Sequence, residues 1–127
     1  MLCSHRSIHA RKTAALISAS VECGAICAGV KGGPRKKAAE FGRTLGLAFQ
    51  IVDDVLDVTG TPEALGKTPG KDARAKKMTY PACVGLERAQ ADASALAVRA
   101  GEKARSLPAR RRNLLASLAR FVKERTS

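Results

Sequence analysis

The chain has 127 residues and a formal net charge of +12, and only 3% of its residues are aromatic. Its length suits one small domain, and the absence of any run of eighteen apolar residues excludes a membrane-crossing helix. The positive charge favours phosphate-bearing partners such as nucleic acid, an anionic membrane or a diphosphate ligand, while the scarcity of aromatic rings argues against base stacking.

Ala, Leu, Lys, Arg and Glu dominate the sequence and strand patterns are nearly absent, so we predict an all-α fold. We expect about four main helices, at residues 5–28, 35–58, 80–106 and 109–124, with Gly101 a candidate break in the third. Residues 61–79 are rich in Pro and Gly and should form a polar connection, with a short helical turn at 63–65. Neither a repeat nor a change in composition divides the chain.

The first predicted helix carries two pairs of metal-binding residue types, each pair four residues apart: His5 with His9, and Cys23 with Cys27. All four lie along one side of a single rod, on which His9 and Cys23 are about 21 Å apart, so they cannot form a tetrahedral zinc site. We therefore expect the cysteines at positions 3, 23, 27 and 83 to be free, reduced and mostly buried. The first residues contain no secretory apolar segment, which predicts an intracellular, cytoplasmic protein.

The second predicted helix gathers acidic residues on one side. Gln50, Asp53, Asp54 and Asp57 fall within an arc of roughly 100°. Carboxylates this close repel one another unless a cation lies among them, and Mg²⁺ takes one or two carboxylates plus substrate phosphates. A solvated acidic face is the alternative. Residues 51–72 hold five acids and two bases, whereas residues 101–127 hold two acids and eight bases, so this is an acidic island in a basic chain. We favour a metal-bridged phosphate site.

The other side of this helix is apolar and should face the core, through Leu45, Ala48, Phe49, Val52, Val55 and Leu56. Gly42 and Gly46 lie on the acidic side. A glycine inside a helix costs about 1 kcal/mol relative to alanine, so two of them indicate that something approaches closely. A ligand channel and tight packing of a neighbouring helix explain them equally well.

Five motifs, taken in order, resemble those of the trans-isoprenyl diphosphate synthases, the polyprenyl synthetase family, and most closely its farnesyl and geranylgeranyl diphosphate synthases. The motifs are Ile8-His9-x-x-Lys12-Thr13, Gly46-x-x-Phe49-Gln50-x-x-Asp53-Asp54-x-x-Asp57, Gly66-Lys67, Gly70-Lys71-Asp72 and Lys77-x-Thr79-Tyr80-Pro81. The resemblance covers nearly the whole chain but only the C-terminal part of the family. It implies that residues 1–127 form a single partial domain, the C-terminal helices of the isoprenoid-synthase fold.

The resemblance also implies roles for individual residues. Asp53, Asp54 and Asp57 correspond to the second aspartate-rich motif, which holds an allylic diphosphate through Mg²⁺. Thr13 and Gln50 would face the developing allylic cation. The residues that would contact the departing diphosphate, or lie in the loop beside it, are Lys12, Lys67, Lys71 and Lys77. Isopentenyl diphosphate then attacks the cation, and the released pyrophosphate takes a proton.

Several basic residues have plainer interpretations when considered alone. Lys12 would be a solvated helix charge, Lys67 and Lys71 ordinary loop lysines, and the run at 110–112 an exposed helix start. Only the order of the motifs favours ligand contacts for the three lysines. Arg125 corresponds to a basic residue that family members carry near the homoallylic diphosphate.

The chain departs from the family because the first aspartate-rich motif and the upstream Gly-Lys-x-x-Arg segment for isopentenyl diphosphate are absent. We therefore expect no prenyl transfer by this chain alone, and dependence on an N-terminal half or on self-association to cover its apolar faces. The less favoured alternative is a non-catalytic basic helical protein that binds nucleic acid or another acidic partner, with a steep dependence on salt.

Overall fold

The computed structural model describes residues 12–60, 79–108, 110 and 112–125. Within these ranges it contains five helices and no strand, which confirms the all-α prediction. In chain order the helices are α2 (Thr13–Cys27), α3 (Gly33–Thr59), α6 (Tyr80–Val84), α7 (Leu86–Arg105) and α8 (Arg112–Glu124).

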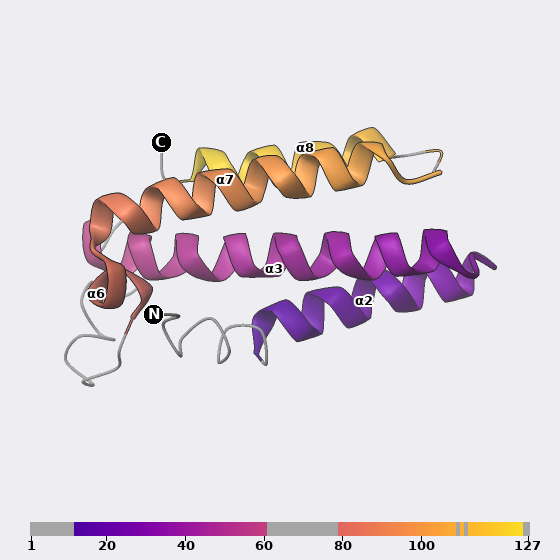
Figure 1. Cartoon of the computed structure of the whole chain (residues 1–127), viewed down its shortest axis with the longest axis horizontal. Coiled ribbons are helices and arrows are strands. Elements are labelled where there is room, and N and C mark those ends of the chain that lie inside the picture. Colours follow the sequence, from indigo (N-terminus) through magenta and orange to yellow (C-terminus); the bar gives the residue numbers. More distant parts are fainter. Residues whose placement is uncertain (1–11, 61–78, 109, 111, 126–127) are drawn as a thin grey trace.

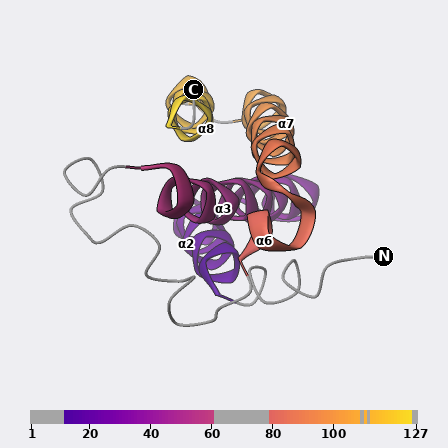
Figure 2. The ribbon, with the colours of Figure 1, turned by 90° about the vertical axis from the view of Figure 1, so that its left-hand side faces the viewer.

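The helices form three layers around α3, the longest of those described (Figure 1). On one side of α3 lies α2, and on the opposite side lie α7 and α8, next to each other (Figure 2). The short α6 lies beside α3 at the end where α7 begins. Helices therefore pack against α3 on two opposite sides, and the hydrophobic core lies around α3.

The core consists of large side chains from α3 packed against alanines. Phe41, Leu45, Ile51, Val52 and Val55 are buried on α3. The small core residues that face them from the neighbouring helices are Ala89, Ala93, Ala97, Ala100 and Ala104 of α7, with Ala116 and Ala119 of α8. The predicted core stripe of α3 is therefore confirmed at Leu45, Ala48, Val52 and Val55, while Phe49 and Leu56 are partly buried at its edge.

The boundaries of α2, α3 and α8 follow the prediction closely. The first predicted helix is observed as Thr13–Cys27, and its residues before position 12 lie outside the described ranges. Pro34 occupies the first turn of α3, where its missing N–H leaves no helical hydrogen bond unmade. The predicted turn at 63–65 also lies outside the described residues.

The third predicted helix is two helices, so the continuous helix at 80–106 was wrong. The break occurs at Gly85, where a φ of +91° is easily adopted only by glycine, and not at Gly101, which lies inside α7. The new helix start at α6 is capped by Thr79, whose hydroxyl accepts a hydrogen bond from the Ala82 N–H at 3.4 Å. Pro81 follows in the first turn.

The expectation that all four cysteines are free and mostly buried was also wrong. Cys83 is disulfide-bonded, and the free thiols of Cys23 and Cys27 are exposed. The side of α2 that faces α3 is marked by the buried Ser18. At 100° per residue, Cys23 and Cys27 lie about 140° and 180° around the helix from Ser18, on the side away from α3.

Apolar surface remains uncovered at two places. Leu114, Leu118 and Phe121 form a stripe along α8 with 63%, 46% and 58% of their surfaces exposed. A groove of about 340 Å³ is lined almost entirely by apolar side chains from the end of α2, the start of α3, and Leu107 and Leu115. None of the described helices has the length and hydropathy needed to cross a membrane.

Candidate functional site

The three predicted acidic ligands lie in the last two turns of α3, and they differ in burial. Asp57 is 1% exposed and Asp54 is 6% exposed, whereas Asp53 is half-buried. A solvated acidic face would leave all three exposed. The burial of two carboxylates excludes that plainer interpretation, and each of the three has a different environment.

Asp54 joins α3 to α6. Its Oδ2 accepts a hydrogen bond from the backbone N–H of Tyr80 at 3.0 Å, which satisfies one of the donors left over at the start of α6. The Tyr80 hydroxyl in turn donates to Asp92 Oδ2 at 2.6 Å, and Arg88 Nε donates to Asp92 Oδ1 at 3.0 Å. Asp54 therefore has a structural role in positioning α6 and the start of α7.

Asp53 forms an ion pair with the end of α8. Its Oδ1 accepts a hydrogen bond from Arg125 Nη1 at 3.2 Å, with roughly a third of each side chain exposed. The Arg125 guanidinium also lies 5.1 Å from the centroid of the Phe49 ring, within the range of a cation–π contact. Arg125 thus lies against α3 and partly neutralises the exposed edge of the acidic cluster.

Asp57 has no such neutralising contact within the ranges that the structure describes. Its carboxylate is buried, and neither oxygen has a hydrogen-bond partner among the described residues. Burying a polar group without a partner is unfavourable, and burying a charge is more so. A buried carboxylate left in this condition is typical of a group kept for a ligand that is bound during function.

The residues present fit Mg²⁺ as a two-carboxylate site. No group of three or more His, Cys, Asp or Glu side chains within the described ranges is close enough to hold a metal, so the predicted triad is not preassembled as a cage. Mg²⁺ requires only one or two carboxylates when substrate phosphates and water complete its shell. Asp53 and Asp57, one turn apart on the same side of α3, supply oxygen donors of that kind.

The two glycines on the acidic side of α3 allow α2 to pack closely. A Cβ built on Gly46 would lie 2.4 Å from Ala14 Cα, and one built on Gly42 would lie 2.7 Å from Ser18 Cα. The structure thus decides between the two explanations of Gly42 and Gly46 in favour of helix packing. A further link is the hydrogen bond at 2.8 Å from Ser18 Oγ to the Ala39 carbonyl.

This packing sets the position of the predicted residues on α2. Because Ala14 lies against Gly46 and Ser18 against Gly42, α2 runs antiparallel to α3 and Lys12 is level with Ala48. Asp53 lies about 7.5 Å further along the axis of α3. The structure thus brings Lys12 and Thr13 to the region of Gln50 and Asp53, with Lys12 exposed and Thr13 and Gln50 half-buried. The other predicted ligands, Lys67, Lys71 and Lys77, lie outside the described residues.

The sequence does not indicate two contacts that, within the described residues, help to hold the acidic cluster in place. Tyr80 is one residue of a motif in the sequence, and in the structure its backbone N–H donates a hydrogen bond to Asp54. The resemblance relates Arg125 to the homoallylic diphosphate, and in the structure its guanidinium donates a hydrogen bond to Asp53. The position of Tyr80 at a proline-marked helix start was a usable signal, since such a start leaves N–H groups that need acceptors.

Comparison with known proteins relates the chain to one family. A family model described as Polyprenyl synthetase matches residues 2–116. Geranylgeranyl pyrophosphate synthase 12, chloroplastic, of Arabidopsis thaliana is 43% identical over 115 residues, which cover 91% of this chain and 32% of that protein. Dimethylallyltranstransferase of Fischerella ambigua is 47% identical over 89 residues, covering 70% of this chain and 26% of that protein.

Solved structures of prenyl diphosphate synthases have the same fold. The heptaprenyl diphosphate synthase of Staphylococcus aureus aligns with a TM-score of 0.91 and 26% identity, over 100% of this chain and 51% of that one. A geranyltransferase of Helicobacter pylori, complexed with magnesium and isoprenyl diphosphate, aligns with a TM-score of 0.75 and 33% identity, over 98% of this chain and 41% of that one. The chain spans about a third of the length of the curated relatives that it matches. It belongs to the polyprenyl synthetase family.

Proposed function

We propose that the chain forms the allylic-diphosphate side of the active site of a prenyl diphosphate synthase. In this proposal Asp53 and Asp57 hold the diphosphate through Mg²⁺, while Asp54 fixes the geometry of α6 beside them. The observation that carries the proposal is the carboxylate of Asp57, which is 1% exposed and has no hydrogen-bond partner among the described residues. The H. pylori geranyltransferase, which shares the fold, was solved with magnesium and isoprenyl diphosphate.

The residues of this chain would promote ionisation of the substrate in three ways. Mg²⁺, when bound, would neutralise charge that develops on the departing diphosphate. Lys12, at the exposed start of α2, would add a positive charge to the same leaving group. Thr13 and Gln50, both half-buried, would present oxygens towards the allylic cation. We place Lys67, Lys71 and Lys77 with the leaving diphosphate as well, on the basis of the motifs alone.

The same proposal requires a second component. The first aspartate-rich motif and the segment that binds isopentenyl diphosphate in the family are absent from these 127 residues. The exposed stripe of α8 and the apolar groove beside Leu107 are surfaces that additional helices would cover. We therefore propose that prenyl transfer to isopentenyl diphosphate needs an N-terminal half in addition to these residues, or another copy of the chain.

A prenyl-transfer assay tests this function. The chain is incubated with Mg²⁺, isopentenyl diphosphate and an allylic diphosphate, alone and mixed with the N-terminal half of a family member. We expect product only in the mixture, and less product when Asp57 is replaced by Asn. Product from the chain alone would show that the first aspartate-rich motif is dispensable, and absence of product in both reactions would contradict the proposed function.

Nucleic-acid binding remains the competing function, because the net charge is +12. It predicts an affinity for duplex DNA that falls steeply with salt and is unchanged or increased by Asp57→Asn. The synthase function predicts the opposite response of diphosphate binding to the same substitution. The cytoplasm stays our prediction for the compartment, and the relatives include chloroplastic proteins of plants.

A further inference from the structure

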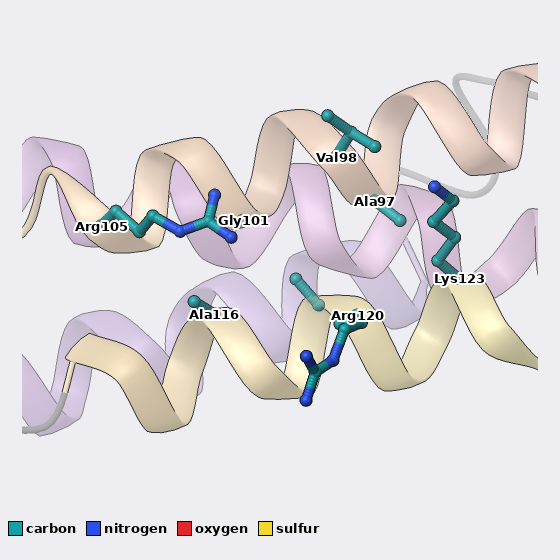
Figure 3. Close-up of a pocket in the computed structure, with 8 residues that line it drawn as sticks. Ala97, Val98, Gly101, Arg105, Ala116, Arg120 and Lys123 are labelled. Atoms are coloured by element: carbon teal, nitrogen blue, oxygen red, sulfur yellow. The ribbon is translucent and has the colours of Figure 1, made fainter.

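A second groove lies between α7 and α8, and none of the residues that line it belongs to α3. Its volume is about 210 Å³, and it is lined by Ala97, Val98, Gly101, Arg105, Ala116, Ala119, Arg120 and Lys123 (Figure 3). A water molecule takes about 30 Å³ in the liquid, so the groove has room for a small anion with several oxygens. Its floor is formed by small residues of the two helices.

The charged side chains among the described residues that line the groove are all basic. Arg105, Arg120 and Lys123 contribute three cations, and no carboxylate is among the described residues that line it. In Figure 3 the Arg105 side chain runs back along α7 to Gly101, and Lys123 extends from α8 towards α7. Arg120 pairs at 3.7 Å with Glu124, with both side chains largely exposed. The Arg105 guanidinium therefore lies beside the floor of the groove, and the Lys123 side chain lines the groove from the facing helix.

Gly101 supplies an independent observation about this groove. A Cβ at Gly42 or Gly46 would collide with the backbone of α2, so packing requires those glycines. A Cβ at Gly101 would meet only Arg105 Nη1 at 3.7 Å and Ala119 Cβ at 3.9 Å, which are ordinary contact distances. Packing therefore does not require a glycine here, although glycine disfavours a helix interior relative to alanine. Because Gly101 has no side chain, the floor of the groove stays open beside the Arg105 guanidinium.

We propose that the α7–α8 groove binds a phosphate-bearing anion of about the size of inorganic diphosphate, with Arg105 as its main ligand. A guanidinium offers a planar fork of N–H donors that matches two phosphate oxygens. The open floor at Gly101 lets the anion approach the Arg105 guanidinium. This site uses no residue of the acidic cluster and requires no metal.

Calorimetric titration of the full chain with inorganic diphosphate tests the proposal. EDTA is present throughout, so that magnesium-dependent binding at Asp53 and Asp57 cannot contribute. Arg105→Gln should weaken binding about tenfold, because it removes the bidentate ligand. Arg99→Gln is the matched control: it removes the same charge from an exposed position on the same helix, outside the groove, and should weaken binding less than about twofold.

A second variant separates the groove from the general charge of the chain. Gly101→Ala should keep the helical circular-dichroism spectrum and melt at the same or a higher temperature, yet bind diphosphate several-fold more weakly because a methyl group occupies the floor. Equal losses in Arg105→Gln and Arg99→Gln would overturn the proposal, since they would indicate diffuse attraction only. Unchanged binding in Gly101→Ala would overturn it too.

The phosphate could be free in solution or belong to a lipid headgroup, and a second titration distinguishes these sources. The chain is mixed with vesicles of neutral lipid, with and without phosphatidylglycerol. If free diphosphate binds and its binding depends on Arg105, the ligand of the groove is a soluble anion. If the chain binds only to the anionic vesicles, with the same dependence on Arg105, the ligand is a lipid headgroup. Binding of neither free diphosphate nor anionic vesicles would contradict the site.

Discussion

Glycine has different roles at two helix interfaces, the one between α2 and α3 and the one between α7 and α8. At α2–α3, Gly42 and Gly46 let two backbones approach until a Cβ would lie 2.7 Å or 2.4 Å from the facing Cα atoms. At α7–α8, Gly101 faces ordinary distances of 3.7 Å and 3.9 Å, and the space beside it is an open groove. The first interface is filled by backbone and the second is left hollow. The same residue type thus indicates packing at one interface and a binding surface at the other.

A similar contrast runs through the acidic end of α3. Asp54 is buried and bonded to the Tyr80 N–H, and Asp53 is bonded to Arg125. Asp57 is buried and unbonded among the described residues. Two acids of the motif thus contribute to the fold as the chain stands. The third acid, Asp57, destabilises the fold unless a ligand compensates for the burial of its carboxylate. Functional sites commonly contain such residues, which lower stability but are needed for activity.

The largest effect should come from Gly46→Ala. The new methyl group would lie 2.4 Å from Ala14 Cα, so α2 must move away, and we expect a loss of about 2–3 kcal/mol in the free energy of unfolding. Thermal melting followed by circular dichroism measures it. The matched control is Gly24→Ala, where a Cβ meets nothing within 4 Å and stability should not fall. An equally stable Gly46→Ala variant would show that the close α2–α3 contact is incorrect.

Asp57→Asn should have the next largest effect, and in the stabilising direction. Removing a buried charge that has no hydrogen-bond partner among the described residues should raise the free energy of unfolding by about 1–2 kcal/mol without altering the shape of the side chain. Denaturant unfolding checks it, with Glu87→Gln at an exposed position as the control for loss of one negative charge. A destabilised Asp57→Asn variant would mean that this carboxylate holds the fold together.

Gly101→Ala should stabilise the chain by up to about 1 kcal/mol, the helix-propensity difference between the two residues. No contact shorter than 3.7 Å opposes the new methyl group. The midpoint of thermal unfolding measures the change. A loss of stability as large as that of Gly46→Ala would remove the distinction between the two interfaces.

The smallest effect should come from Arg125→Gln. The Arg125–Asp53 pair is roughly one-third exposed on both sides, so solvent screening leaves about 0.5 kcal/mol or less, even with the Phe49 contact. Because Arg125 occupies an oxygen of Asp53, the substitution should also strengthen binding of Mg²⁺ alone. Calorimetry with MgCl₂ compares the two proteins, and weaker Mg²⁺ binding in the variant would contradict competition for Asp53.

Much of the fold could be predicted from sequence because the signals were local. The period of apolar residues and the proline at position 34 located α3 within two residues at its start and one at its end. The break at Gly85 could not be predicted, since a lone glycine looks the same at positions 85 and 101 and only the packing of α6 against α3 requires a turn there. The exposure of Cys23 and Cys27 could not be predicted, because apolar residues are spread around α2 without a clear stripe and the buried side carries the polar Ser18.

The candidate site was predictable in its residue types and not in its contacts. The motif contains Asp53, Asp54 and Asp57, and their spacing predicts the same role, that of a metal ligand, for all three. Their partners, Tyr80 and Arg125, are 26 and 72 residues away in sequence, so only the fold could separate a structural acid from an unbonded one. Likewise, only the position of α2 could decide whether Gly42 and Gly46 make room for a ligand or for a neighbouring helix.

The most direct test of the account is a calorimetric titration of the chain with an allylic diphosphate, with and without Mg²⁺, for the wild type and for Asp57→Asn. Inorganic diphosphate titrated in EDTA gives the metal-independent background to subtract. We expect a magnesium-dependent component in the wild type that is about tenfold weaker or absent in Asp57→Asn. A magnesium-dependent component of equal strength in both proteins would show that the buried carboxylate of Asp57 is not a ligand of the metal–diphosphate complex.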